Sequence, residues 1–196
     1  MRWNSWVTYA LFAALVTVGA KLWTPVPVEG EVTDFLRSVP GGGLWSAFNG
    51  FVESKWAFAA AVLAVTFALY VFFQPRDVVL PLAGLAGGMM IGWVIQPFVE
   101  RPRPGLIGMV TLGGFPSGSA MLYASWLGAV ALVCMRRVRS DGVRKVAVAL
   151  LAVFIVLGGI ARVASGAHWF LDVAGAWLWS AAWLVWLDRA TRGVSA

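Results

Sequence analysis

Long apolar stretches alternate with short polar connections along the whole chain. A helix needs roughly 20 apolar residues to cross the hydrocarbon core of a bilayer, and backbone groups in lipid must be satisfied internally. We therefore expect a transmembrane helix in each stretch and no strand. The predicted spans are residues 6–23, 56–73, 78–98, 119–135, 146–163 and 170–187. The pattern predicts an all-α fold, a six-helix membrane bundle that forms a single domain over residues 1–196.

The segment between the first two spans has a different pattern. Prolines and the run Gly41-Gly42-Gly43 divide it into pieces. Residues 32–39 and 44–52 mix apolar and polar positions at helical spacing, which is typical of helices that lie on a membrane surface. We predict two short interfacial helices that frame a lateral entry for a lipid. A surface loop with no function in lipid access is the alternative.

Glycines recur at intervals of four in the third span, at Gly84, Gly88 and Gly92. Small residues on one face of a membrane helix let a second helix approach closely. This stripe therefore predicts tight helix packing rather than chemistry.

Composition supports the assignment to a membrane. Hydrophobic residues make up 60% of the chain and charged residues only 12%, which excludes an ordinary soluble domain. A net charge of +6 would suit a nucleic-acid partner in a soluble protein. In such an apolar chain, basic residues instead record insertion topology and contact with anionic headgroups, so no nucleic-acid partner is expected.

The distribution of basic residues predicts the orientation of the bundle. If the helices alternate in direction, one side collects Arg2, Arg76, Arg136, Arg137, Arg139, Arg144, Lys145, Arg189 and Arg192. That side should be cytoplasmic, with both termini inside the cell. Three polar strings then meet at the opposite, extracytoplasmic face, and their convergence predicts one functional site in the cell membrane.

The first string follows the third span and carries Arg101 and Arg103, each followed by proline. Arginine offers a planar fork of donors that suits phosphate oxygens. Two arginines at a wet rim therefore indicate an anion clamp. Contact with lipid headgroups explains an arginine pair about as well.

The second string, Pro116-Ser117-Gly118-Ser119, opens the fourth span. Free amides and the positive end of the helix dipole favour a phosphate there, and Gly118 allows close approach of the backbone. The hydroxyl of Ser117 can cap the helix or donate to the anion.

The third string carries His168 and Asp172 at the start of the last span, with Arg162 at the end of the span before it. Residues four apart on a helix share one face, so the carboxylate can reach an imidazole nitrogen. Such a contact fixes the tautomer and leaves the other ring nitrogen free to attack.

With these motifs, the chain resembles the type 2 phosphatidic acid phosphatase (PAP2) family, membrane lipid phosphatases that share a site design with vanadium haloperoxidases. The family pattern is a lysine, Arg-Pro seven residues later, Pro-Ser-Gly-His, and then Ser-Arg, five residues, His, three residues and Asp. The chain matches this pattern at Arg103, Pro104, Pro116, Ser117, Gly118, Arg162, His168 and Asp172.

The resemblance implies a metal-independent hydrolase without a cofactor, acting on a lipid phosphate. His168 would form a phosphohistidine, and Asp172 would orient it. Arg103, Arg162, Ser117 and Gly118 would hold the phosphoryl oxygens, because arginines supply the positive charge that magnesium provides elsewhere.

Two positions depart from the family pattern. Gln96 stands at the lysine position, and Ser119 stands at the position of the histidine that acts as general acid. Serine at its ordinary acidity is a poor acid, and Glu100 is a weak substitute because Arg101 beside it favours the ionised carboxylate. Without an acid an alkoxide, with a conjugate acid of pKa about 15.7, leaves poorly, whereas phosphate re-protonates with a pKa of about 6. We therefore expect a polyprenyl diphosphate as substrate rather than a phosphatidic acid.

Two alternatives follow from the same departures. A protein that has lost catalysis would keep the pocket and bind or help to move a lipid phosphate. A phosphotransferase would pass the phosphoryl group to another lipid. The sequence makes no prediction of the oligomeric state.

Overall fold

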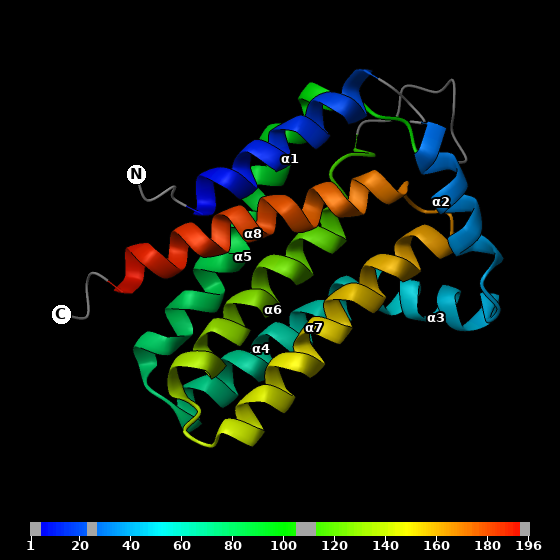
Figure 1. Ribbon diagram of the computed structural model, residues 1–196. Coiled ribbons are helices and arrows are strands. Elements are labelled where there is room, and N and C mark those ends of the chain that lie inside the picture. Colours follow the sequence, from blue (N-terminus) through cyan, green and yellow to red (C-terminus); the bar gives the residue numbers. More distant parts are fainter. Residues whose placement is uncertain (1–4, 23–26, 105–112, 193–196) are drawn as a thin grey trace.

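A computed structural model describes residues 5–22, 27–104 and 113–192, and within these residues every regular element is a helix. The helices are α1 (Ser5–Leu22), α2 (Pro27–Ser38), α3 (Gly42–Glu53), α4 (Lys55–Phe72), α5 (Pro75–Val99), α6 (Gly118–Arg137), α7 (Asp141–Ala164) and α8 (Phe170–Arg192). Figure 1 shows the long helices running side by side as a bundle, with α2 and α3 across one end. The predicted all-α fold is confirmed.

Six of these helices, α1 and α4 to α8, are long and apolar enough to cross a membrane. They coincide with the predicted spans, but several extend further into polar sequence. At the start of α7, the Ser140 side chain accepts a hydrogen bond from the Val143 amide, so the helix begins before its apolar part. At the start of α5, Gln74 and Asp77 form a capping box around Pro75. Hydropathy marks the membrane-crossing part of a helix, whereas caps mark its ends.

The two short helices predicted between the first two spans are present as α2 and α3. They are separated at Pro40 and at Gly41, whose φ of 106° is left-handed and suits glycine. Their proposed function in lipid entry stays a prediction.

Helix α6 lies at the centre of the bundle. The glycines of α5 bring the two backbones together, as the stripe predicts: a Cβ at Gly84 would lie 2.7 Å from the Ser125 carbonyl oxygen of α6. On the other side of α6, the Ser125 hydroxyl donates to the Ser180 hydroxyl of α8 at 2.9 Å. A close glycine contact and a buried polar contact thus fix α6 between α5 and α8.

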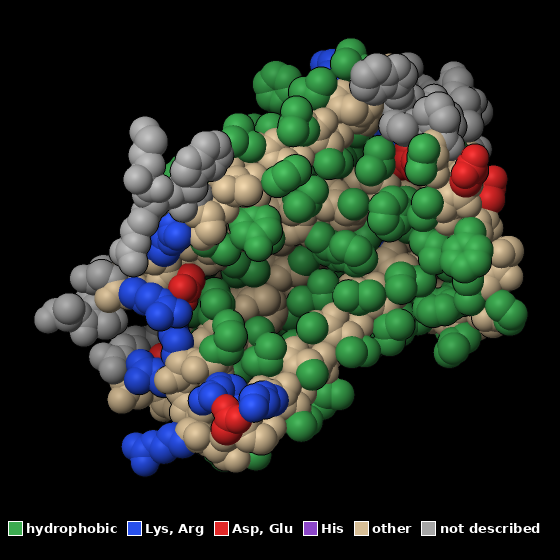
Figure 2. Space-filling view, viewed as in Figure 1, with side chains coloured by type: hydrophobic (Ala, Val, Ile, Leu, Met, Phe, Trp, Pro, Cys, Tyr) green, Lys and Arg blue, Asp and Glu red, His purple; other side chains and the backbone are tan. Residues whose placement is uncertain are grey.

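The two ends of the bundle differ in charge. Helices α5 and α7 end, and α6 and α8 begin, at the end that α2 and α3 cover (Figure 1). Lysine and arginine side chains gather at the opposite end, where α1 begins and α8 ends (Figure 2). This separation agrees with the predicted grouping of basic residues, except that Arg2 and the side chain of Arg76 lie outside the described part of the structure.

Candidate active site

His168 and Asp172 meet where α7 passes into α8. The turn is held by the amides of Ala167 and His168, which both donate to the Arg162 carbonyl oxygen at 3.1 Å. Asp172 lies in the first turn of α8, and its Oδ2 is 3.2 Å from His168 Nδ1. Both side chains are buried. The predicted pairing of imidazole and carboxylate is therefore present in the structure.

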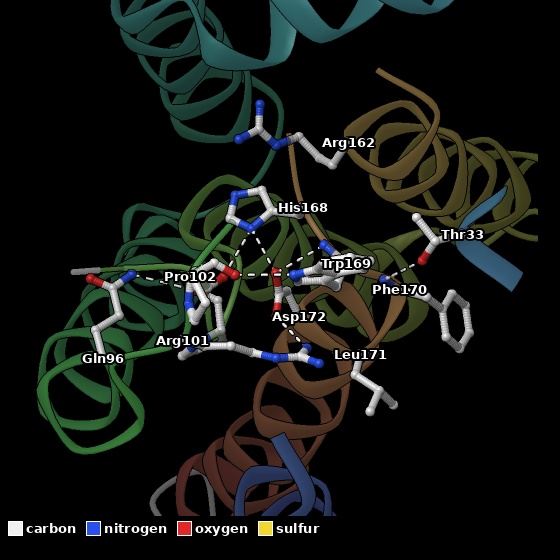
Figure 3. Close-up of polar contacts among 12 residues, drawn as sticks. Thr33, Gln96, Arg101, Pro102, Arg162, His168, Trp169, Phe170, Leu171 and Asp172 are labelled. Carbon is white, nitrogen blue, oxygen red and sulfur yellow. Dashed lines mark hydrogen bonds and ion pairs between the residues drawn. The ribbon is translucent and has the colours of Figure 1, made fainter. Parts of the chain in front are cut away.

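The surroundings of the His168 ring define its tautomer. Nδ1 lies 2.9 Å from the Gly114 carbonyl oxygen as well as close to Asp172. A carbonyl oxygen and a carboxylate only accept, so we assign the ring proton to Nδ1. Nε2 then keeps its lone pair, and it points away from Asp172 on the side where Arg162 lies (Figure 3).

Several effects set the charge of His168. Burial is the largest and lowers the pKa of the imidazole. The hydrogen bond and charge of Asp172 oppose that effect, while the positive charges of Arg162 and Arg103 add to it, and the net shift of the pKa is downward. The ring is consequently neutral, and available as a nucleophile, at neutral pH.

Arg162 reaches the site from the end of α7. Its side chain is 2% exposed, and its Nη1 lies 2.7 Å from Asn49 Oδ1 and 2.5 Å from Glu53 Oε1, both on α3. Burial raises the pKa of the Glu53 carboxyl. The hydrogen bond and charge of Arg162, together with the Asn49 hydrogen bond and the Arg103 charge, outweigh burial, and the net shift of the pKa is downward. Arg162 Nε is buried and has no hydrogen-bond partner. A buried, unpaired N–H on a cation can donate to an anion oxygen.

Ser117 provides a second unpaired donor. It is the N-cap residue of α6, yet its hydroxyl does not cap the helix. The side chain is fully buried, and Oγ has no hydrogen-bond partner. Its amide donates to the Asp172 carbonyl oxygen at 2.9 Å, which joins the start of α6 to the start of α8. Of the two functions predicted for this hydroxyl, helix capping is therefore not the one observed.

The remaining predicted residues lie around the same end of the bundle. Arg103 is half-buried, and its positive charge acts on His168, Arg162 and Glu53. The Gln96 amide lies 3.4 Å from the Pro116 carbonyl oxygen, at the start of α6. Gly118 and Ser119 form the first turn of α6, where both are partly exposed.

Arg101 differs from the prediction. Its side chain is 0% exposed, so the expected position at a wet rim is wrong. One nitrogen, Nη1, donates to Asp172 Oδ1 at 2.8 Å and to Glu29 Oε1 at 3.0 Å, while Nη2 pairs with Glu29 Oε2. The carboxylate of Asp172, in the pair with His168, and the carboxylate of Glu29, on α2, draw this arginine inward. Glu100, the residue that follows α5, is exposed.

Backbone contacts hold the Arg101 segment against the neighbouring loop. The Gly114 amide donates to the Arg101 carbonyl oxygen at 3.1 Å, and a Cβ at Gly114 would lie 2.2 Å from that oxygen. Only glycine fits at this distance. Trp169 Nε1 donates to the Pro102 carbonyl oxygen at 3.0 Å. The segments that carry Arg101, Ser117 and His168 are thus linked directly.

Sequence reasoning missed the acidic and polar partners on α2 and α3. These are Glu29, Thr33, Asn49 and Glu53. Each pair is spaced by four residues within one amphipathic helix, which places both members on one face. That spacing was an available signal for a polar face turned inward. The Gly114 carbonyl oxygen had no signal in the sequence, because its contact depends on tertiary folding.

No group of three or more His, Cys, Asp or Glu side chains that could hold a metal ion occurs in the described ranges. Metal independence of the chemistry stays a prediction.

The sequence and the fold are both similar to those of known proteins. The family model of the PAP2 superfamily matches residues 77–193. The fold is similar to the crystal structure of a transmembrane PAP2 type phosphatidylglycerolphosphate phosphatase from Bacillus subtilis, with a TM-score of 0.76, 18% identity and 96% of each chain covered. It is also similar to LpxE from Aquifex aeolicus, with a TM-score of 0.62 and 16% identity, over 82% of this chain and 94% of that one. No curated protein sequence matches.

Proposed function

Because the chain belongs to the PAP2 superfamily, we propose that it is a membrane lipid phosphatase that hydrolyses a polyprenyl diphosphate through a phosphohistidine. The observation that carries this proposal is the pair of unpaired buried donors, Arg162 Nε and Ser117 Oγ, beside a histidine with a free Nε2. Buried side-chain donors on Trp45, Tyr123, Trp126 and Trp177 also lack a partner among the described residues, but only Arg162 and Ser117 belong to the motifs around His168. An anion oxygen would satisfy both of them.

The phosphoryl group binds between the start of α6 and the end of α7. Arg162 and Arg103 contribute positive charge, and Ser117 and the amide of Gly118 donate hydrogen bonds. The start of α6 adds the positive end of a helix dipole, which favours a phosphate. Arg162 is fixed in advance by Asn49 and Glu53, so little reorganisation is needed when charge develops in the transition state.

In the first step the lone pair of His168 Nε2 attacks the terminal phosphorus. The bond between that phosphorus and the bridging oxygen breaks, and the lipid monophosphate leaves with the electron pair. The imidazole now carries a positive charge, which Asp172 stabilises through the hydrogen bond to Nδ1.

In the second step a water molecule attacks phosphorus, the N–P bond breaks, and inorganic phosphate leaves. The electron pair of the N–P bond returns to Nε2, and one proton of the water passes to solvent. The released lipid monophosphate takes up a proton from solvent. Ser119 cannot supply a proton efficiently, and a phosphate leaving group with a pKa of about 6 needs that help least. This is the reason for proposing a diphosphate rather than a monoester.

The proposed orientation places this site on the extracytoplasmic face, with both termini in the cytoplasm. Its support is the separation of basic residues from the site end of the bundle (Figure 2). Helices α2 and α3 would then lie at the outer leaflet, where a lipid could enter from the side.

The test is phosphate release by the purified protein from a polyprenyl diphosphate and from a phosphatidic acid in the same detergent. We expect faster release from the diphosphate. The matched variant Ser119→His should raise release from the monoester much more than release from the diphosphate. Faster cleavage of phosphatidic acid by the unaltered protein would contradict the proposed substrate.

A second candidate function is binding or movement of a lipid phosphate without hydrolysis, which Gln96 and Ser119 favour. It predicts saturable binding of the diphosphate with no phosphate release, whereas measurable release excludes it. A phosphotransferase would instead form a phosphorylated lipid when an acceptor is added to the same assay.

A further inference from the structure

Arg101 lies behind the dyad, on the side of Asp172 opposite to His168 (Figure 3). Its guanidinium bridges two carboxylates, Asp172 and Glu29, and all three side chains are nearly or fully buried. Nothing in the proposed reaction uses Glu29 or Arg101, which bind each other, Asp172 and the Leu171 amide. A buried ion pair is costly to form unless its geometry is good. The presence of this one behind the reacting group calls for a function.

Glu29 belongs to α2, yet it is bound into the start of α8. Its Oε1 accepts from Arg101 and also from the Leu171 amide, at 2.8 Å. One turn later on α2, Thr33 Oγ1 accepts from the Phe170 amide at 3.4 Å. These two side chains therefore bind amides of the first turn of α8, the turn that carries Asp172.

The carboxylate of Asp172 is held on both oxygens. Oδ1 accepts from Arg101, and Oδ2 accepts from the Trp169 amide at 3.0 Å and faces His168 Nδ1. The carboxylate cannot rotate without breaking the bond to Arg101. The direction in which it meets the imidazole is thus defined by a cation that is itself oriented by Glu29.

We propose that Glu29 and Arg101 are positioning residues, which hold Asp172 in the orientation that fixes the His168 tautomer and set the charge that His168 experiences. The proposal rests on the proposed function in taking His168 as the nucleophile. The proposal gives α2 a second function besides framing the site. The helix supplies Glu29, the first residue in a series of linked side chains that continues through Arg101 and Asp172 to His168.

The charges of Glu29, Arg101 and Asp172 predict how each of these residues acts on the imidazole. Arg101 lies between two carboxylates, so the cluster carries one net negative charge, which favours protonated His168. The other charged groups near the ring are Arg162 on α7, Arg103 after α5, and Glu53 of α3 through its pair with Arg162. Removing the Glu29 charge makes the cluster neutral and disfavours the imidazolium. Removing the Arg101 charge has the opposite effect.

His168 is the chain's only histidine, so its titration can be followed directly by NMR of protein labelled with ¹⁵N-histidine. The variants are Glu29→Gln, Arg101→Gln and the double variant. Opposite charges within 4–6 Å shift a pKa by about 1–3 units, and these groups act from further away, so we expect shifts of roughly half a unit. The titration should move down in Glu29→Gln, up in Arg101→Gln, and back to the original value in the double variant.

The matched control is Thr33→Val, which removes the other contact between α2 and the first turn of α8 without changing any charge. It should leave the titration unchanged. In steady-state assays, Glu29→Gln should lower kcat with little change in KM, because the phosphate donors are untouched.

A purely structural function of the pair would give a different result. Glu29→Gln would then shift the titration no more than Thr33→Val does, or in the same direction as Arg101→Gln, and either result overturns the proposal. If Arg101→Gln does not fold, the comparison of Glu29→Gln with Thr33→Val decides alone. The titration needs no substrate, so it tests this proposal separately from the proposed function. The titration can contradict the positioning of His168 in a protein that hydrolyses the lipid, and it can support the positioning in a protein that does not.

Discussion

Two buried arginines lie on opposite sides of the His168–Asp172 pair, and their surroundings differ. Arg101 is enclosed between Glu29 and Asp172, whose side chains are 1% and 0% exposed. Arg162 pairs with Glu53, whose side chain is 45% exposed, and its Nε has no hydrogen-bond partner. Both were predicted to bind phosphate. The structure instead separates a cation neutralised by buried carboxylates from one that keeps a free donor.

The difference shows that the partners of an arginine, rather than its distance from the site, indicate its function. A guanidinium enclosed by two carboxylates has little charge left for a ligand and acts by orienting its neighbours. A guanidinium anchored on one side by a partly solvated carboxylate keeps an N–H for an incoming oxygen. The two arginines should therefore respond differently to substitution.

Of the variants compared, Arg162→Ala is expected to lose the most activity. Removing one preorganised donor to a developing negative charge lowers kcat about 10²–10³-fold, and this variant removes a full charge as well. Inhibition by inorganic phosphate should weaken in parallel, because the product binds at the same donors. In Arg101→Gln the affinity for phosphate should stay unchanged while kcat falls. Equal weakening of phosphate inhibition in both variants would contradict the distinction.

Arg162→Lys sharpens the same test. Lysine keeps the charge but lacks the planar fork, so it cannot bind Glu53 and an oxygen in the same arrangement. We expect activity between those of the original protein and Arg162→Ala, measured as kcat/KM on the diphosphate. Activity equal to that of the unaltered protein would show that charge alone matters at this position.

A smaller loss is expected for Ser117→Ala. The hydroxyl has no partner in the structure, so its removal breaks no contact and should leave the melting temperature unchanged or slightly raised. Loss of one hydrogen bond to the charged phosphoryl group, about 1.5–3 kcal/mol, should lower kcat/KM roughly ten- to hundredfold. Unchanged kinetics would show that the hydroxyl does not contact the substrate.

The lowered pKa of His168 is expected to have the smallest effect on activity at neutral pH. A nucleophilic imidazole must be neutral, and burial together with Arg162 and Arg103 favours the neutral form. In the pH profile of kcat/KM, the midpoint of the acidic limb should therefore lie below the ordinary histidine pKa of about 6.5. Activity should fall only as the pH drops through the lowered pKa. A limb above 6.5 would contradict this environment for the ring.

The sequence predicts much of this molecule because the relevant signals are local. Apolar runs long enough to cross a bilayer define the spans, and the spacing of four between His168 and Asp172 defines the dyad. The stripe of Gly84, Gly88 and Gly92 predicts close approach of another helix, which the structure confirms and identifies as α6.

The distinction between the two arginines could not be predicted in this way. Arg101 is drawn inward by Glu29, which is 72 residues away in the sequence. Arg162 is anchored by Asn49 and Glu53 on a helix that hydropathy describes only as amphipathic. The spacing of four on α2 and α3 indicates a polar face turned inward. It does not show which arginine that face meets, because partners so distant in sequence depend on how the helices pack against the bundle.

The central claim is that His168 Nε2 attacks phosphorus, and the most direct test is to trap the intermediate. The protein is mixed with a polyprenyl diphosphate labelled with ³²P at the terminal phosphate, quenched in alkaline detergent within one turnover, and mapped by peptide analysis. We expect label on the peptide that contains His168, and neither label nor turnover in His168→Ala. Normal turnover in His168→Ala, or label on another residue, would contradict the account.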